Sequence, residues 1–262
     1  MTGTQTLDAP EVTARPLLMQ IDRVGKTFGR DVVALRGMSL DVRQGDFISL
    51  LGPSGCGKST ALRLIAGLIH PTQGRIRWEG PRELGVVFQE ATLMPWATVE
   101  DNVWLPMRLK GRPKAQVRGD IAEALELVGL KGFEKAYPRE LSGGMKMRVS
   151  IARAMVTKPS LILMDEPFAA LDEITRFKLN NDLLAMKDKL GCTVIFVTHS
   201  VFESVFLSDR IVIMAARPGR VIEEVGVNEP YPRTEIYRTS ADYAAHCRDA
   251  SDALKRAMGE AA

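Results

Sequence analysis

Residues 52–60 constrain this chain more than any other segment. They read GPSGCGKST and fit the phosphate-loop pattern G-x-x-x-x-G-K-[ST]. The apolar run at 46–51 predicts a buried strand before the loop, and 60–66 predicts a helix after it, which is the context that the motif requires. A glycine-rich turn before an ordinary core helix has no need of adjacent Lys58 and Ser59. The segment therefore predicts a nucleoside triphosphate site.

The chemistry of the loop explains its composition. Glycines let backbone N–H groups turn toward a phosphate, and the following helix N-terminus adds partial positive charge. The ammonium of Lys58 can reach the β- and γ-phosphate oxygens, and the hydroxyl of Ser59 can ligate Mg²⁺. We expect the nucleotide to contact the whole loop, which consists of Gly52, Pro53, Ser54, Gly55, Cys56, Gly57, Lys58, Ser59 and Thr60.

Two further apolar runs end in polar side chains. Residues 161–164 predict a buried strand that ends at Asp165 and Glu166, and residues 193–197 predict another that precedes His199. In open parallel sheets, ligands bind at the carboxyl ends of the strands. We expect Asp165 to hold the Mg²⁺ shell and Glu166 to orient or deprotonate the attacking water. A lone histidine at a strand end is more often structural, and we assign no function to His70 or His246.

Two shorter segments complete a recognisable order. Residues 141–145 read LSGGM, and 170–172 read ALD. Together with the phosphate loop, Gln89, the Asp165-Glu166 pair and His199, they make six elements arranged as in the nucleotide-binding subunits of ATP-binding cassette (ABC) transporters. From about residue 19 to 220, the chain resembles this family. Below, 141–145 is called the signature segment and 170–172 the D-loop.

The resemblance implies a fold and a division of the chain. The fold is α/β: a P-loop NTPase of the ABC type, with a RecA-like core sheet, an antiparallel β subdomain and a helical signature subdomain. We expect a flexible tail at 1–16, an ABC ATPase domain at 17–230 with its helical subdomain at about 90–159, and a helical tail at 231–262. Within the domain, Pro218-Gly219 between the apolar runs 211–214 and 221–225 predicts a β-hairpin.

The resemblance also implies roles for individual residues. Catalytic groups would be Glu166, His199, Gln89 and Lys58. Mg²⁺ would be ligated by Ser59, by Gln89 and, through water, by Asp165. Phe28 occupies the place where an aromatic ring stacks on adenine. In a head-to-tail homodimer that encloses two ATP molecules, the nucleotide of one copy would meet the signature helix of the other; the remaining expected nucleotide contacts are Ser142, Gly143, Gly144 and Asp172.

Three positions in these motifs need separate comment. Met145 stands where glutamine is more usual, so a side-chain hydrogen bond to the nucleotide is not expected there. Ala170 replaces a serine or glycine and supports no conclusion. Cys56 lies within the phosphate loop, so we expect a thiol reagent attached to it to block the nucleotide and ATP to protect it, unless the thiol is neutral and inert.

Length and composition indicate the size of the domain and the cellular compartment of the protein. The chain has 262 residues, 45% of them hydrophobic, which suits one α/β domain with a smaller helical lobe. A net charge of +3 with dispersed basic residues gives no indication of nucleic acid binding. Three widely spaced cysteines predict neither disulfides nor a metal site and fit a reducing cytoplasm. No run approaches the about 18 apolar residues that a membrane span needs, and 1–16 lacks the apolar stretch of a signal peptide.

Transport would therefore depend on partner chains. We expect integral-membrane permease subunits, an indirect link to a periplasmic or extracellular binding protein, and a location on the cytoplasmic face of the membrane. Residues 93–96, 101–103 and 217–220 resemble the branch serving nitrate, sulfonate, taurine and pyrimidine-precursor importers. The apolar segment around Trp96 is either a socket for a short permease helix or a packed loop core, and the residues alone do not decide.

Two other functions remain open at this stage. One is a soluble ABC ATPase that drives DNA repair, translation or metal-cluster assembly, although the chain shows neither the long coiled-coil insertion of repair relatives nor the two fused cassettes of translation relatives. The other is a non-hydrolysing scaffold, which is disfavoured by Glu166, Gln89 and His199.

The C-terminal tail shows helical spacing of its mostly apolar residues, which are Ile236, Tyr243, Cys247, Ala250, Leu254 and Met258. We expect this tail to pack on the domain; a regulatory or subunit contact is the alternative.

Overall fold

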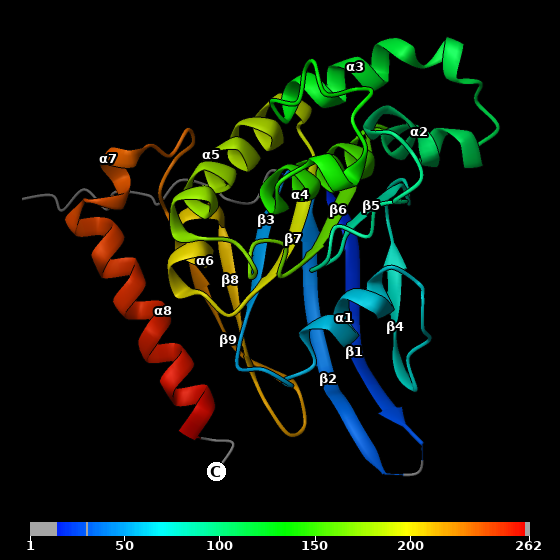
Figure 1. Ribbon diagram of the computed structural model, residues 1–262. Helices are drawn as coiled ribbons and strands as arrows, with labels where there is room; N and C mark the ends of the chain where they lie inside the picture. Colours follow the sequence, from blue (N-terminus) through cyan, green and yellow to red (C-terminus); the bar gives the residue numbers. More distant parts are fainter. Residues whose placement is uncertain (1–14, 30, 260–262) are drawn as a thin grey trace, which may run out of the picture.

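The computed structural model describes residues 15–29 and 31–259 (Figure 1). Its central element is a six-stranded sheet in the order β5-β6-β7-β3-β8-β9. The strands from β5 to β8 pair in parallel, and β9 returns antiparallel to β8, which confirms the predicted hairpin. The strands are β3 (Phe47–Leu51), β5 (Leu84–Val87), β6 (Leu161–Asp165), β7 (Thr193–Thr198), β8 (Arg210–Ala215) and β9 (Arg220–Gly226).

The central strands are apolar because both faces of the sheet are covered. β3 and β7 are buried over their whole length, as parallel strands inside an α/β fold usually are. Successive side chains of β3 alternate between the two faces. Phe47 and Leu51 pack in the core cluster shared with helices α4, α5, α6 and α8, whereas Ile48 and Leu50 pack in the cluster on the opposite face.

A second sheet covers that opposite face. It is antiparallel, in the order β2-β1-β4, and consists of β1 (Leu17–Phe28), β2 (Val32–Arg43) and β4 (Gln73–Trp78). With helix α1 (Lys58–Ile65), it packs against the central strands around Met19, Leu35 and Leu50. The parallel sheet, the antiparallel sheet and the helices confirm the expected α/β fold.

The segment between β5 and β6 is helical, as predicted for residues 90–159. Thr98 caps α2 by accepting a hydrogen bond from the backbone N–H of Asp101. Ser142 caps α4 in the same way. The helical elements are α2 (Val99–Leu109), η2 (Lys114–Gln116), α3 (Arg118–Leu127), η3 (Pro138–Glu140) and α4 (Gly143–Met155). The domain boundaries themselves remain a prediction, and residues 1–14 of the expected tail lie outside the described residues.

The remaining helices follow β6 along the chain, and of these α6 contacts β3 and β7, whereas α8 contacts β8 and β9. They are α5 (Glu173–Leu190), α6 (Val201–Leu207), α7 (Glu235–Arg238) and α8 (Ala241–Gly259). Figure 1 shows α8 running alongside β8 and β9. Buried Arg233 ties this tail to the domain, because its guanidinium donates hydrogen bonds to the carbonyls of Val205, Phe206 and Ser208 at the end of α6.

The tail departs from the predicted pattern at its two ends. The prediction placed Ile236 and Met258 on the packed face, but Ile236 is 80% exposed and Met258 is 54% exposed. The helix is interrupted at residues 239–240, so α7 and α8 do not share one face. Ala253 and Ala257 are fully buried, and their small side chains let α8 approach the domain closely. Within the described residues, the structure contains no helix with the length and apolar character needed to span a bilayer.

Candidate functional site

The phosphate loop connects the end of β3 to the start of α1. Gly55 and Gly57 have φ angles of 79° and 91°, a region that residues with a side chain rarely adopt. A Cβ on Gly57 would also lie 2.8 Å from the carbonyl oxygen of Ala34. Gly52 is equally confined, since a Cβ there would lie 2.6 Å from the carbonyl oxygen of Met214. The glycines are therefore required by the backbone and by its close packing.

Lys58 begins α1 and is only 5% exposed. Its ammonium donates to the carbonyl oxygens of Gly52, at 2.7 Å, and Pro53, at 3.1 Å. It also lies 3.9 Å from Oε1 of Glu166. The N-terminal turn of α1 contains no acidic side chain. This end of the loop is thus positively charged, and it faces the carboxylate that follows β6.

Ser59 and Asp165 supply two oxygen atoms side by side. The Ser59 hydroxyl donates to Oδ1 of Asp165 at 3.0 Å. Burial raises the pKa of Asp165, and the hydrogen bond from Ser59 partly opposes this rise. Hydroxyl and carboxylate oxygens are ligands that Mg²⁺ accepts, usually together with water and substrate phosphates. The donor set at this position therefore fits a magnesium ion.

Glu166 follows Asp165 in a backbone conformation that non-glycine residues seldom adopt, with φ 45°. Its backbone N–H donates to the carbonyl of Val197 on β7. One carboxylate oxygen, Oε2, lies 3.2 Å from Nδ1 of His199. β6 and β7 are adjacent and parallel, with Asp165 paired to Val197, so the two strand ends bring Glu166 and His199 together. The contact between Glu166 and His199 therefore depends on the register of β6 against β7.

These groups surround a cavity of about 400 Å³. Gln89, two residues after the end of β5, is exposed and lines this cavity. Ala34 of β2 also lines the cavity. It was not predicted from the sequence, because a small residue in a strand carries no recognisable pattern. The lining residues are Ala34, Ser54, Gly55, Gly57, Lys58, Ser59, Thr60, Gln89, Asp165 and Glu166.

Phe28 and Cys56 are not among the lining residues. Phe28 ends β1 and is 40% exposed, with the ammonium of Lys26 5.1 Å from the centre of its ring. Cys56 is fully buried, and burial raises the pKa of its thiol. That a reagent attached to this thiol blocks the nucleotide, and that ATP protects the thiol, stays a prediction. Its inert alternative fits the buried, neutral side chain.

The signature segment lies outside the phosphate-loop cavity. The hydroxyl of Ser142 accepts a hydrogen bond from the backbone N–H of Met145, and Ser142 and Gly143 are exposed. A Cβ on Gly144 would lie 3.0 Å from Cγ2 of Thr175, so this glycine allows α4 to approach α5. This packing role of Gly144 is not visible in the sequence. Met145 is half-buried and packs against the core.

The D-loop meets the signature segment at this point. A Cβ on Gly143 would lie 3.8 Å from Cδ2 of Leu171. Asp172 caps α5, since its Oδ1 accepts a hydrogen bond from the backbone N–H of Thr175 at 2.9 Å. The predicted site residues therefore form two sets. One surrounds the phosphate loop, and the other is exposed and combines the signature segment with the D-loop.

Comparisons with known proteins identify the family of the chain. A family model described as ABC transporter matches residues 35–169, just over half of the chain. An uncharacterized ABC transporter ATP-binding protein of Methanocaldococcus jannaschii is 47% identical over 90% of this chain and 91% of its own length. The aliphatic sulfonates import ATP-binding protein SsuB of Bacillus cereus is 44% identical over 84% of this chain and 90% of its own length.

A solved structure is similar in its fold. It is the dimeric, post-hydrolysis structure of the ATP-binding cassette MJ0796, bound to ADP and Pi. The TM-score is 0.71 at 31% sequence identity, and the match covers 81% of this chain and all of the other.

Proposed function

Since the chain belongs to the ABC transporter family and is an ATP-binding subunit with ATPase activity, we propose that it powers a multi-subunit importer of a small solute. The observation that carries this proposal is the phosphate-loop cavity, in which Lys58, the Ser59-Asp165 pair and Glu166 meet. The relative named for aliphatic sulfonate import favours a small organic anion as the solute. Partner chains would select it.

The proposed reaction is in-line attack of water on the γ-phosphate of ATP. The loop amides and the ammonium of Lys58 hold the β- and γ-phosphate oxygens. Ser59, Gln89 and Asp165 would hold Mg²⁺, which neutralises charge on the phosphates when bound. Glu166 orients the water and accepts its proton, and the carboxylate is itself oriented by the contact with His199. Phe28 stacks on adenine at the edge of the site.

Completion of the site requires a second copy. Ser142, Gly143 and Gly144 do not line the cavity of their own chain, yet Ser142 and Gly143 are exposed at the N-terminus of a 13-residue helix. The first turn of that helix has no acidic residue, so its amides and dipole favour an anion. We infer that this end meets the γ-phosphate held by the other copy, with Asp172 nearby. ATP then joins a head-to-tail homodimer, and hydrolysis releases it.

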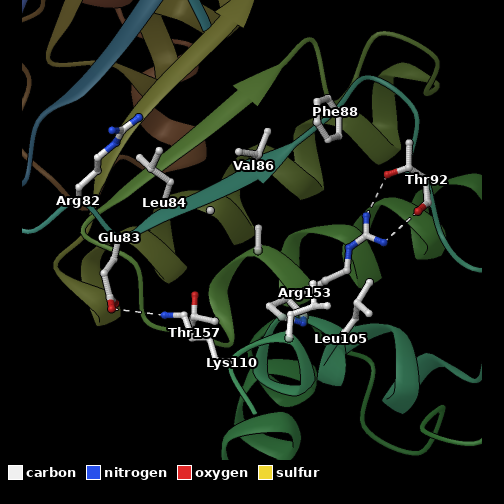
Figure 2. A pocket seen from close by; sticks show the side chains of 14 residues that line it. Arg82, Glu83, Leu84, Val86, Phe88, Thr92, Leu105, Lys110, Arg153 and Thr157 are labelled. Carbon is white, nitrogen blue, oxygen red and sulfur yellow. Dashed lines mark hydrogen bonds and ion pairs between the residues drawn. The ribbon is translucent and has the colours of Figure 1, made fainter. Parts of the chain in front are cut away.

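A groove beside the site provides a place for the permease. It has a volume of about 590 Å³ and lies between edge strand β5 and helices α2 and α4 (Figure 2). Leu84 and Val86 of β5 and Leu105 and Leu109 of α2 line it, and Phe88 lies at one end. Leu109 is 79% exposed. A short amphipathic helix fits a groove of this composition.

The groove is continuous with the nucleotide site along the chain. Phe88 precedes Gln89, and the guanidinium of Arg153 on α4 holds the following loop. It donates to the carbonyl oxygen of Ala91 and to that of Thr92 (Figure 2). Trp96 is 77% exposed and does not line this groove. The segment around Trp96 was one of the two predictions for a permease socket. We therefore place the permease contact at β5 and α2, and the protein at the cytoplasmic face of the membrane.

The test is copurification from native membranes. The tagged chain should bring down a multi-span permease, and Leu109→Glu should abolish this, because a carboxylate would replace the apolar surface that Leu109 presents to the groove. Met258→Glu is the matched control: Met258 is exposed on α8, away from the groove, and its replacement should leave the complex intact. Recovery of soluble partners alone would refute the importer and favour an ATPase without a membrane partner. A permease retained by Leu109→Glu would refute the groove.

A further inference from the structure

A second cavity, of about 390 Å³, lies where α5 and α6 meet the C-terminal segment. It is separate from the nucleotide cavity, and no residue lines both. Figure 1 shows α5, α6 and α7 converging beside the upper end of α8. The lining residues are Glu173, Arg176, Phe177, Asn180, Ser200, Phe202, Glu203, Glu235, Arg238, Thr239 and Tyr243.

Unpaired buried polar atoms gather on this lining. Asn180 is 1% exposed, and neither its amide nitrogen nor its amide oxygen has a hydrogen-bond partner among the described residues. The same holds for Oε1 of Glu203 and for Nε of Arg176 and of Arg238. Buried polar groups are nearly always hydrogen-bonded, because leaving one without a partner is energetically unfavourable. Five such atoms around one cavity indicate that something polar binds there.

Two ion pairs join these groups, but at distances longer than a hydrogen bond. Nε of Arg176 lies 3.6 Å from Oε1 of Glu203, and Nε of Arg238 lies 3.7 Å from Oε1 of Glu235. Both distances exceed that of a hydrogen bond. The Arg238 guanidinium is held between two phenyl rings, at 3.4 Å from the ring centre of Phe206 and 4.6 Å from that of Phe177. Its position is thus fixed, while its Nε makes no hydrogen bond.

The unpaired atoms define the chemistry of the ligand. Donors come from the two arginines and the Asn180 amide, and they match an anionic group. Acceptors come from Glu203 and the Asn180 oxygen, and they match an ammonium group. Exposed Glu173 and Glu235 at the rim favour a cation as well, while the rings of Phe202 and Tyr243 offer apolar surface. A ligand that carries an anionic group, an ammonium group and an apolar portion matches these donors, acceptors and rings.

The cavity also adjoins two segments of the nucleotide site. Glu203 accepts a hydrogen bond from the Thr198 hydroxyl through its other oxygen, and Thr198 directly precedes His199. Arg176 donates through Nη2 to the carbonyl of Leu171 in the D-loop, at 3.1 Å. A ligand that binds Glu203 and Arg176 therefore touches the supports of both segments.

We propose that this cavity binds a small zwitterion of the amino-acid type and that its occupancy changes the rate of ATP hydrolysis. The binding step does not depend on the identity of the transported solute. The coupling step rests on the proposed roles of His199 and the D-loop.

The test uses the purified full chain and each of the twenty common L-amino acids. At a hundredfold excess over its dissociation constant, a ligand should raise the melting temperature by about 5 °C or more. Titration calorimetry then gives its affinity. The amide and N-acetyl derivatives of the best ligand, which lack the anionic and ammonium groups respectively, should each bind about tenfold more weakly or worse. Nucleotide binding is measured on the same samples, so failure at the ATP site is recognised separately.

Variants distinguish a ligand site from a hydrated cavity. Asn180→Leu should abolish ligand binding without lowering the melting temperature, because it removes an unpaired buried amide. Phe202→Ala, at the exposed mouth, should weaken binding about fivefold or more, and Phe133→Ala, an exposed phenylalanine elsewhere, should not. No binding by any amino acid, or equal binding to Asn180→Leu, would overturn the site and leave water as its content.

The coupling has its own readout. Saturating ligand should change the rate of phosphate release about fivefold or more in the wild-type chain and leave it unchanged in Asn180→Leu. Equal rates with and without bound ligand would overturn the link to hydrolysis.

Discussion

Replacing Glu166 by glutamine is the sharpest test of the proposed chemistry. Glutamine keeps the shape of the side chain and its contacts 3.2 Å from Nδ1 of His199 and 3.9 Å from Nζ of Lys58, but it cannot accept the proton from water. A positioned general base contributes about 10²–10⁴ in rate. Its loss therefore raises the activation free energy by about 3–5 kcal/mol.

Nucleotide binding should survive this change. The charge of Glu166 is one of the causes that raise the pKa of neighbouring Asp165, after burial. Removing that charge lowers the pKa of Asp165, in the direction that favours its ionised form. The metal position beside Ser59 is thus retained or improved. ATP affinity should stay within about threefold of wild type, which corresponds to less than about 1 kcal/mol.

The measurement is phosphate release from the assembled complex, with ATP affinity and dimer formation followed on the same preparation. We expect a closed, ATP-bound dimer to accumulate. Glu79→Gln is the control, because Glu79 is an exposed carboxylate outside the cavity, and its variant should hydrolyse ATP normally. Wild-type turnover by Glu166→Gln would refute the assigned role, and loss of ATP binding would show that the residue acts in binding.

Three further predictions address other residues. Lys58→Ala should weaken ATP binding about tenfold or more, because it removes the cation of the loop; unchanged affinity in calorimetry would contradict the phosphate-loop assignment. Arg233→Ala should lower the free energy of unfolding in urea by about 3–5 kcal/mol, because carbonyls at the end of α6 lose a buried charged donor, and a loss below about 1 kcal/mol would show that the tail packs independently of it. Burial raises the pKa of Glu203 in the folded state, so the wild type binds more protons folded than unfolded, and its stability should decline as pH rises from the ordinary carboxyl pKa through the raised one. Glu203→Gln should abolish that decline, and identical pH dependence of the urea midpoint in both proteins would contradict it.

The sequence predicted the phosphate loop and its neighbours because their residue types are dictated by local geometry. The alternation of apolar strands with polar strand ends was equally visible, since parallel strands buried on both faces must be apolar throughout. The tail was predicted less well. Helical spacing identified α8, but it placed Ile236 and Met258 on the packed face, because periodicity does not show where a helix is interrupted.

The chain by itself determined which chemistry is available: a lysine and a serine after a glycine loop, two carboxylates after one strand, and a histidine after another. Only the tertiary structure decided which of these groups meet. The register of β6 against β7 brings Glu166 to His199, and the packing of α4 on α5 makes Gly144 a contact point for Thr175. The buried thiol of Cys56 and the unpaired amide of Asn180 also became visible only in the fold. Spacing along a chain fixes the conformation of neighbours, whereas burial and contact between distant residues depend on how the elements pack.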